Sequence, residues 1–356
     1  MKKKVFWEFL RYCLDDASSL PESAKTIDWQ AMMVLAQIQG ITGVIFRGIE
    51  KSDKALNIPL NHLMKWMSCA RKLQKRNLLV DTRCLEIISM FQKDGFETCI
   101  LKGQGNALYY PDPSLRTPGD IDLLVTNKPQ RETISYVKTY NPGSRAVYHH
   151  VEWGQFNGVE AEIHYKAAFF FSPLVNCRLQ KWLRKHLDVQ QQALPNDCGS
   201  IPVPNWEYNV VFQLAHIYNH ILHQGIGLKQ IIDYYYLLKS AERPQTEEFT
   251  PLFKYLGMQK IAGAVMWVLH KRLGLSEQYL IAPLDEKRGK ILLANTMKGG
   301  CFGVSDQEMA RADNQLKQNV LRLKRDWRML RYFPSECLWE PVFRVYHSLW
   351  RLAYNH

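Results

Sequence analysis

Apolar residues recur every three or four positions along most of this chain, which is the spacing of one face of an α-helix. The pattern predicts helices over residues 5–14 and, with Asp28 as the N-cap, up to residue 39. Residues 60–93 are almost free of Gly and Pro and predict one long helix or two abutting ones, with Gly95 as the C-cap. Beyond Ser172 the chain is predicted to be helical apart from a loop around residues 195–204, with helices over residues 205–222, 228–240, 247–255, 260–273, 286–295, 306–331 and 336–353.

Between these helical regions the apolar spacing changes to that of short strands. Residues 96–101 and 121–125 each predict a strand, and between them stand a glycine turn, a short helix and a proline-rich loop. A helix is then predicted over residues 129–139, where a proline stands near the first turn. This middle part of the chain therefore combines strands and helices.

A β-hairpin is predicted next, around Asn157-Gly158. This dipeptide favours a tight type I′ turn because both of its central residues need a positive φ. In the strand that follows the turn, Glu160, Glu162 and His164 share one face, and apolar residues occupy the other. The polar face of this strand is predicted to line a site.

Asp120 and Asp122 stand where the earlier strand, residues 121–125, begins. Residues two apart in a strand point to the same face, so these two carboxylates are predicted to project side by side. Together with Glu162 they would form a three-carboxylate cluster, which is costly unless a divalent cation neutralises it. Ligand sets made only of oxygen suit Mg²⁺ or Mn²⁺, and two such ions can clamp the attacking and leaving oxygens of an in-line phosphoryl displacement.

The glycine turn before this strand is a candidate seat for an anion. Gly103 allows backbone and phosphate to approach closely, and Lys102 would add positive charge. Arg116, in the proline-rich loop, can make bidentate contacts with phosphate oxygens. The sequence thus places candidate phosphate-binding residues directly before the candidate metal ligands.

Composition favours an anionic partner and a reducing compartment. Lys and Arg outnumber Asp and Glu by 46 to 34, a formal net charge of +12 that suits nucleotides, RNA or an anionic membrane, although an ordinary basic soluble protein is an equal alternative. The eight cysteines are scattered, without zinc-ligand spacing, and are expected to be reduced thiols. With no apolar run of about 18 residues and no cleavable leader pattern, the chain is predicted to be cytoplasmic without a transmembrane segment.

These motifs together resemble the nucleotidyltransferase family of the DNA polymerase β-like superfamily, in a largely uncharacterised branch with a Lys-Gly turn. The resemblance rests on Leu101-Lys102-Gly103, Leu108-Tyr109, Pro113, Arg116, Asp120-Ile121-Asp122-Leu123-Leu124 and Glu162-Ile163-His164-Tyr165, and it extends to His216, His220 and the segment 227–233. It implies an α+β fold, mostly helical overall, with a small mixed β-sheet as its core. That core is expected at residues 73–198, between an N-terminal helical region, 1–72, and a C-terminal helical domain, 199–356.

The resemblance also implies roles for individual residues. Asp120, Asp122 and Glu162 are expected to be catalytic and to bind Mg²⁺ or Mn²⁺. Nucleotide contacts are expected from Lys102, Gly103, Gln104 and Arg116, and substrate contacts from His164, His216, His220 and Asp233. Two positions depart from the family pattern, since Gln104 replaces the usual serine after the glycine and Glu162 replaces the commoner aspartate.

The predicted activity is Mg²⁺-dependent transfer of a nucleoside monophosphate from an NTP, with ATP as the expected donor, to an unidentified hydroxyl acceptor while pyrophosphate leaves. Gln104 keeps open a catalytically weakened nucleotide-binding regulatory module as an alternative. The net charge and the basic stretch 317–331 keep open an RNA-modifying nucleotidyltransferase, although nucleic acid is not the favoured partner. An Asp-x-Asp pair alone also occurs in glycosyltransferases, and His216 and His220 alone would equally suit core hydrogen bonding.

Overall fold

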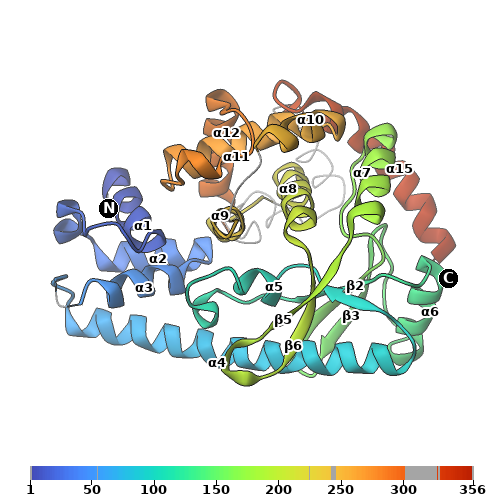
Figure 1. The fold of residues 1–356 in the computed structure, drawn as a ribbon, viewed down its shortest axis with the longest axis horizontal. Coiled ribbons are helices and arrows are strands. Elements are labelled where there is room, and N and C mark those ends of the chain that lie inside the picture. The colour runs from blue at the N-terminus through green and yellow to red at the C-terminus, as the bar shows by residue number, and fades with distance from the viewer. Residues whose placement is uncertain are drawn as a thin grey trace, which may run out of the picture.

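A four-stranded mixed β-sheet lies at the centre of the structure, with helices on both of its sides (Figure 1). The computed structural model describes residues 2–53, 55–223, 225–241, 246–300, 327 and 329–354. The predicted fold class is confirmed, because the described chain is α+β and mostly helical with a small mixed sheet.

The strand order of this sheet is β1-β2-β4-β3. β2 and β4 are parallel, whereas the pairs β1–β2 and β3–β4 are antiparallel. The bounds of the strands are β1 (Thr98–Ile100), β2 (Ile121–Val125), β3 (His150–Phe156) and β4 (Val159–His164). All four strands fall within the segments predicted from the sequence, and the hairpin turns at Asn157-Gly158 as expected.

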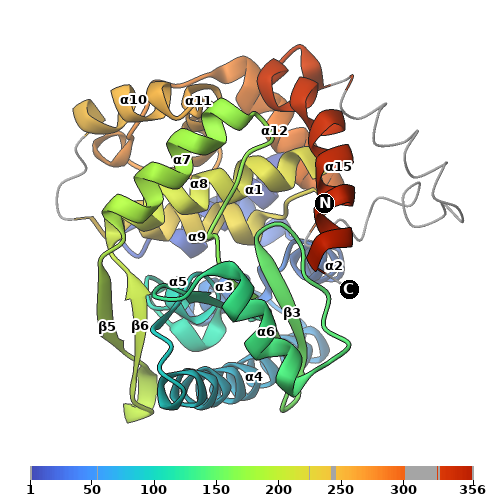
Figure 2. The same cartoon turned by 90° about the vertical axis from the view of Figure 1, so that its right-hand side faces the viewer.

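The two faces of the sheet differ in polarity because side chains alternate along each strand. Ile121, Leu123 and Ile163 point to one face and pack in a hydrophobic cluster against α4 (Leu60–Lys93). α4 is one continuous helix of 34 residues, which settles the prediction of one helix or two. The carboxylates of β2 and β4 are therefore left on the opposite face. In both ribbon views, α8 (Trp206–His223) and α9 (Leu228–Lys239) lie on the side of the sheet away from α4 (Figure 1 and Figure 2).

The helices whose bounds the sequence predicts agree with the structure to within a few residues. Asp28 caps α2 as expected, since its side chain accepts a hydrogen bond from the Ala31 N–H at 3.0 Å. The predicted helix 306–331 lies mostly outside the described residues. The bounds are α1 (Lys3–Leu14), α2 (Trp29–Gln39), α3 (Thr42–Lys51), α5 (Gln104–Ala107), α6 (Gln130–Tyr140), α7 (Pro173–His186), α10 (Thr246–Tyr255), α11 (Gln259–Lys271), α12 (Glu286–Gly299) and α15 (Pro334–Tyr354).

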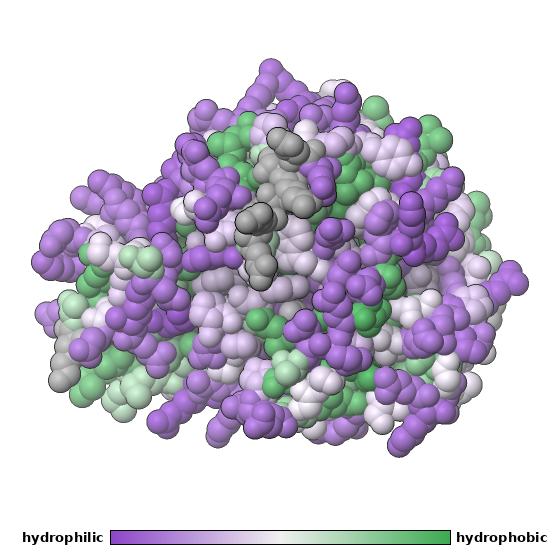
Figure 3. Space-filling view, viewed as in Figure 1, coloured by the Kyte–Doolittle hydropathy of each residue, from purple (hydrophilic) through white to green (hydrophobic). Residues whose placement is uncertain are grey.

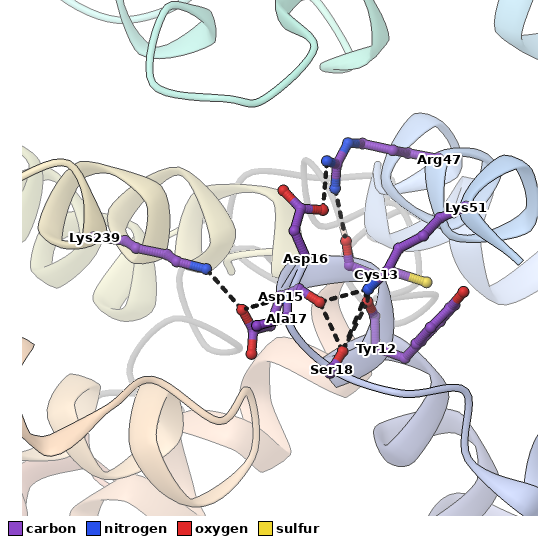
Figure 4. A network of polar contacts seen from close by, with 9 residues as sticks. All are labelled: Tyr12, Cys13, Asp15, Asp16, Ala17, Ser18, Arg47, Lys51 and Lys239. Atoms are coloured by element: carbon purple, nitrogen blue, oxygen red, sulfur yellow. Dashed lines mark hydrogen bonds and ion pairs between the residues drawn. The ribbon is translucent and has the colours of Figure 1, made fainter.

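Two lysine side chains, one on α3 and one on α9, contact the carboxyl end of α1 (Figure 4). Lys51, at the end of α3, donates hydrogen bonds to the backbone carbonyls of Tyr12 at 3.0 Å and Asp15 at 2.6 Å. Lys239, at the end of α9, lies 3.2 Å from a carboxylate oxygen of Asp15. A helix leaves its last carbonyls without intrahelical partners, and cations there are stabilising. These contacts join the N-terminal helices to the helix that carries Asp233.

A second, two-stranded sheet contradicts the sequence prediction, which has a helical region beyond Ser172 interrupted by a loop around residues 195–204. β5 (Val189–Ala193) and β6 (Ser200–Pro204) form an antiparallel hairpin. All residues of β5 are exposed, so β5 lacks the apolar alternation that signals a strand, and the prolines at 202 and 204 of β6 are unfavourable within a strand. β6 is nevertheless held in place because Ile201 and Val203 pack into the hydrophobic cluster beneath the central sheet.

The predicted domain borders both fall inside structural units. The border after residue 72 lies within α4, and the border after residue 198 lies between β5 and β6. The division into three regions stays a prediction.

The surface is mainly hydrophilic on the face that Figure 3 shows, with apolar residues in smaller patches. Across the described ranges, no helix combines the length and the apolar character needed to cross a lipid bilayer. The cytoplasmic location stays a prediction.

Candidate active site

A cavity of about 460 Å³ separates the polar face of the sheet from α8 and α9. The sheet side contributes carboxylates and histidines, and the helical side contributes histidines, amides and a lysine. The residues 167–169, which follow β4, form a further part of its wall. The lining includes Lys102, Gly103, Asn106, Arg116, Gly119, Asp120, Asp122, His149, His150, Glu160, Glu162, His164, Phe169, Gln213, His216, Asn219, His220, Lys229, Gln230 and Asp233.

Asp122 and Glu162 are paired across the parallel strands β2 and β4 and project toward this cavity. The Lys102 ammonium lies 3.0 Å from Oδ1 of Asp122, and Nε2 of His164 lies 2.9 Å from the same oxygen. Nε2 of His164 is also 3.4 Å from Oε2 of Glu162. Asp120 lines the cavity two residues before Asp122. The structure thus brings together the three predicted carboxylates with Lys102 and His164.

The charges of this cluster shift its pKa values in opposite directions. Burial alone would raise the pKa of Asp122, but Lys102 and His164 hold it well below its usual range. The neighbouring Asp122 carboxylate, aided by burial, raises the pKa of Asp120 to about 6. Burial would lower the pKa of His164, yet its bonds to Asp122 and Glu162 raise it to about 9. Near pH 7 a protonated His164 therefore balances part of the carboxylate charge.

The other histidines of the cavity are neutral near pH 7. Burial lowers the pKa of His150 and of His220 to about 4, and it lowers those of His149 and His216 well below the ordinary histidine value. A neutral imidazole can donate one hydrogen bond, accept another, or bind a metal ion. Each of these four rings therefore remains available for polar recognition without adding positive charge.

Gly103 shapes the turn that delivers Lys102 to the cavity. Its φ of +54° lies in the region that favours glycine, and a Cβ at this position would stand 3.2 Å from the backbone oxygen of Asp120. The next residue, Gln104, points away from the cavity toward α4, where its amide donates to the carboxylate of Asp81 and, at 3.4 Å, to Asn77. The predicted nucleotide contact of the Gln104 side chain is thus not placed at this site.

Arg116 and Asp233 form a buried, two-pronged ion pair at the edge of the cavity. Nε and Nη2 of Arg116 each lie 2.8 Å from a different oxygen of Asp233, and the Tyr110 hydroxyl donates to Asp233 at 2.7 Å. Both charged side chains are at most 5% exposed. The pair ties the loop before β2 to α9, so the Arg116 charge is already balanced by a carboxylate within the protein.

Sequence reasoning missed several residues of the cavity, of which Lys229, His149 and His150 bear most on its chemistry. Lys229 is 6% exposed and stands on α9 one helical turn before Asp233. Residues four apart lie on the same helix face, so the spacing of Lys229 from Asp233 could have indicated that both face the site. His149 and His150 reach the cavity from the start of β3. Their adjacency in sequence gave no indication of a shared site, because neighbouring residues in a strand point to opposite faces.

Among the residues that the structure describes, two overlapping groups of side chains have donor atoms close enough to share a metal ion. One is Asp122, Glu162 and His164, and the other is His149, His150 and His164; within each group the donor atoms lie within 4.8 Å of one another. The carboxylates of the first group, with Asp120 beside them, fit a hard divalent cation such as Mg²⁺. In the protein alone, Lys102 and His164 supply the positive charge at this point.

Comparison with known proteins supports the resemblance seen in the sequence. A family model described as "uncharacterised nucleotidyltransferase" matches residues 25–274 of the 356. A comparison with curated proteins gives no significant match. The crystal structure of an antigenic nucleotidyltransferase-like protein from Paracoccidioides brasiliensis is similar over 60% of this chain and 95% of that chain, with 14% identity and a TM-score of 0.36. A structural likeness at that level bears on neither mechanism nor substrate.

Proposed function

The chain belongs to this family of uncharacterised nucleotidyltransferases, and from that premise we propose that it transfers a nucleoside monophosphate from an NTP to a small hydroxyl acceptor. The observation that carries the proposal is the pairing of Asp122 with Glu162 in one cavity, with Asp120 and Lys102 beside them. Carboxylates gathered in this way suit the metal-assisted transfer of a phosphoryl-type group.

The proposed metal ligands are Asp120, Asp122 and Glu162, with Mg²⁺ as the expected ion and Mn²⁺ as its substitute. When bound, such an ion supplies charge that neutralises the phosphate oxygens and the leaving pyrophosphate. In the protein alone, the Lys102 ammonium lies 3.0 Å from Asp122. Once a bound metal ion balances the charge of Asp122, Lys102 would contact phosphate oxygens instead. These ligand roles rest on donor chemistry and on the shared face of β2 and β4.

The phosphates are proposed to lie between Lys102 and Lys229, which approach the cavity from the sheet and from α9 respectively. Gly103 keeps the turn open, since a side chain there would project next to the backbone of Asp120. Two ammonium groups on opposite walls would hold a triphosphate in a fixed orientation. Fixed orientation and nearby positive charge both lower the barrier to phosphoryl-type transfer.

In the proposed reaction the acceptor oxygen forms a bond to the α-phosphorus of the NTP as the bond from that phosphorus to the β-phosphate oxygen breaks. Pyrophosphate leaves with the electrons of the broken bond. Glu162 is proposed to take the proton of the acceptor hydroxyl, because its side chain is 32% exposed whereas that of Asp122 is 1% exposed. The hydrogen bond from His164 lowers the pKa of Glu162 against the effect of burial, so Glu162 is ionised near pH 7.

The acceptor is proposed to lie against α8, where His216, Asn219 and His220 line the cavity. The neutral imidazoles and the amide can hydrogen-bond to hydroxyl groups without attracting a second phosphate. A volume of about 460 Å³ leaves little space once an NTP is bound, which favours a small molecule or one protruding group of a larger one.

A second candidate function is nucleotide binding without turnover. It is favoured by one observation, the orientation of Gln104 toward Asp81, which leaves position 104 without a side-chain contact to the phosphates. In that case the protein would act as a nucleotide-responsive module.

The two candidates are separated by incubating the protein with each α-labelled NTP, Mg²⁺ and a fractionated cell extract as the source of acceptors. Nucleotidyl transfer predicts a labelled product that is lost in Asp120→Asn and retained in Asp188→Asn, a change at an exposed carboxylate remote from the cavity lining. Saturable NTP binding with no labelled product from any fraction would support the second candidate.

A further inference from the structure

Three histidines gather at one end of the cavity, where the start of β3 lies beside the end of β4. His150 pairs with His164 across the antiparallel β3–β4 ladder, and His149 precedes β3 at a bend in the chain. In a regular strand His149 and His150 would point to opposite faces. The bend instead lets their rings meet, with centroids 4.4 Å apart, so three imidazoles converge beside Glu162.

The donor atoms of this cluster are spaced like the ligands of a metal ion. Nε2 of His149 lies 3.0 Å from Nδ1 of His150, which lies 3.3 Å from Oε2 of Glu162. The same Glu162 oxygen is 3.4 Å from Nε2 of His164. A tetrahedral zinc ion with bonds of about 2.0–2.1 Å holds its ligand atoms about 3.3–3.4 Å apart. The successive separations therefore resemble the edges of a coordination tetrahedron.

Hydrogen bonds within the protein do not satisfy all of the ring nitrogens in this cluster. Nδ1 of His150 takes part in two contacts, one with His149 and one with Glu162, and a single proton serves only one of them well. A cation would accept electron pairs from Nε2 of His149, Nδ1 of His150 and Oε2 of Glu162 at once.

We propose that His149, His150, His164 and Glu162 form a binding site for a divalent transition-metal ion of the Zn²⁺ or Co²⁺ class. The site adjoins the carboxylate site proposed for Mg²⁺ and shares Glu162 with it, and binding of the ion would displace the proton that His164 carries near pH 7 in the protein alone. Imidazole nitrogens favour such ions over Mg²⁺, which prefers oxygen ligands. The inference goes beyond the proposed reaction and does not require it, because it concerns which ion these side chains hold.

The test is a titration of the metal-stripped, full-length protein with Co²⁺, followed by the visible absorption bands of tetrahedral cobalt. The expected result is saturation at one ion per chain, with excess Mg²⁺ unable to displace the bound ion. His149→Ala and His150→Ala should each weaken Co²⁺ binding by at least about tenfold. Asp120→Asn, which alters the carboxylate site alone, and His62→Ala, which alters a histidine of α4 outside the cavity lining, should keep it.

Circular dichroism and thermal melting would establish that each variant is folded, and His149→Asn and His150→Asn serve as polar replacements if either alanine variant is not. Absence of the cobalt bands, their persistence in both histidine variants, or complete displacement of Co²⁺ by Mg²⁺ would overturn the proposal. The readout contains no transfer step. Its failure would therefore leave the nucleotidyl-transfer proposal standing, and a failed transfer assay would leave this one standing.

Discussion

Asp122 on β2 and Glu162 on β4 occupy paired positions of a parallel ladder, so their carboxylates project to the same face of the sheet. The two carboxylates have different surroundings: Asp122 balances the charges of Lys102 and His164, whereas Glu162 is partly exposed to solvent. The pairing explains why residues 40 positions apart in sequence can serve one chemical centre.

Removing either charge of this pair should strongly lower the rate of nucleotidyl transfer. Asp122→Asn and Glu162→Gln are each expected to lower the rate of nucleotidyl transfer by about 100-fold or more, because a neutral amide binds a divalent cation weakly. Rates measured with α-labelled NTP at saturating Mg²⁺ test this, with Asp188→Asn as the matched control. Near-normal rates in both variants would mean that the metal-binding carboxylates lie elsewhere.

The buried pair of Arg116 and Asp233 should contribute to stability more than to nucleotide affinity. Asp233→Asn leaves the Arg116 charge unbalanced in the interior and is expected to lower the free energy of unfolding by about 3–5 kcal/mol. The double variant Arg116→Met/Asp233→Leu should recover most of that loss, since neither charge of the pair remains. Urea denaturation measures both, and a loss below about 1 kcal/mol in Asp233→Asn would argue against the pair as a structural tie.

Gly103 and Gln104 are neighbours with different expected roles, which makes them a matched pair of test positions. Gly103→Ala should raise the KM for NTP by about tenfold or more, because the turn has a positive φ and borders the proposed phosphate site. Gln104→Ala should leave that KM within about twofold, yet lower the free energy of unfolding by about 1–3 kcal/mol, because Asp81 loses a buried partner. Equal changes in KM for the two variants would contradict the assigned orientation of Gln104.

Glu336, at the start of α15, should make stability depend on pH. Burial raises the pKa of Glu336 to about 7, against the hydrogen bonds it accepts from the backbone N–H groups of Phe171 and Ser172. The folded protein therefore holds a proton that the unfolded chain has already lost, so stability is greatest below about pH 4.5 for this group and falls as the pH rises to about 7. The expected loss across this window is on the order of 3 kcal/mol.

Denaturant titrations at pH 5 and pH 8 measure this effect. The difference between the two pH values should shrink in Glu336→Gln, which keeps one acceptor oxygen without the charge. Glu22→Gln, at an exposed position, is the matched control for removing one carboxylate. An undiminished pH difference in Glu336→Gln would assign the effect to another group.

Local patterns in the sequence predict the helices and the strands of the central sheet well, because each is a matter of apolar spacing and turn residues. They also predict the carboxylate face, since Asp120 and Asp122 stand two apart and Glu162 lies on a strand with a polar side. Contacts between residues far apart in the sequence are not predicted by local patterns. The partner of Arg116 stands 117 residues away on α9, and no local signal connects the two.

The histidine cluster shows how a bulge of one residue in a strand can prevent a site from being predicted from the sequence. Counting back from the Asn157-Gly158 turn without interruption would pair His164 with Val151. A bulge between Glu152 and Gly154, where Gly154 has a φ of +81°, shifts the register by one residue and places His150 opposite His164 instead. Because a shift of one residue moves every later side chain to the other face, this site becomes visible only in the structure.

The proposed reaction moves the α-phosphoryl group of an NTP, with its nucleoside, to an acceptor hydroxyl. Parallel reactions with α-labelled and γ-labelled ATP, in which labelled product and released pyrophosphate are measured together, distinguish this reaction from other uses of the nucleotide. We expect that α-label enters the product in a one-to-one ratio with pyrophosphate, that γ-label does not, and that Asp120→Asn shows neither. Transfer of γ-label to the product, or release of inorganic phosphate in place of pyrophosphate, would contradict it.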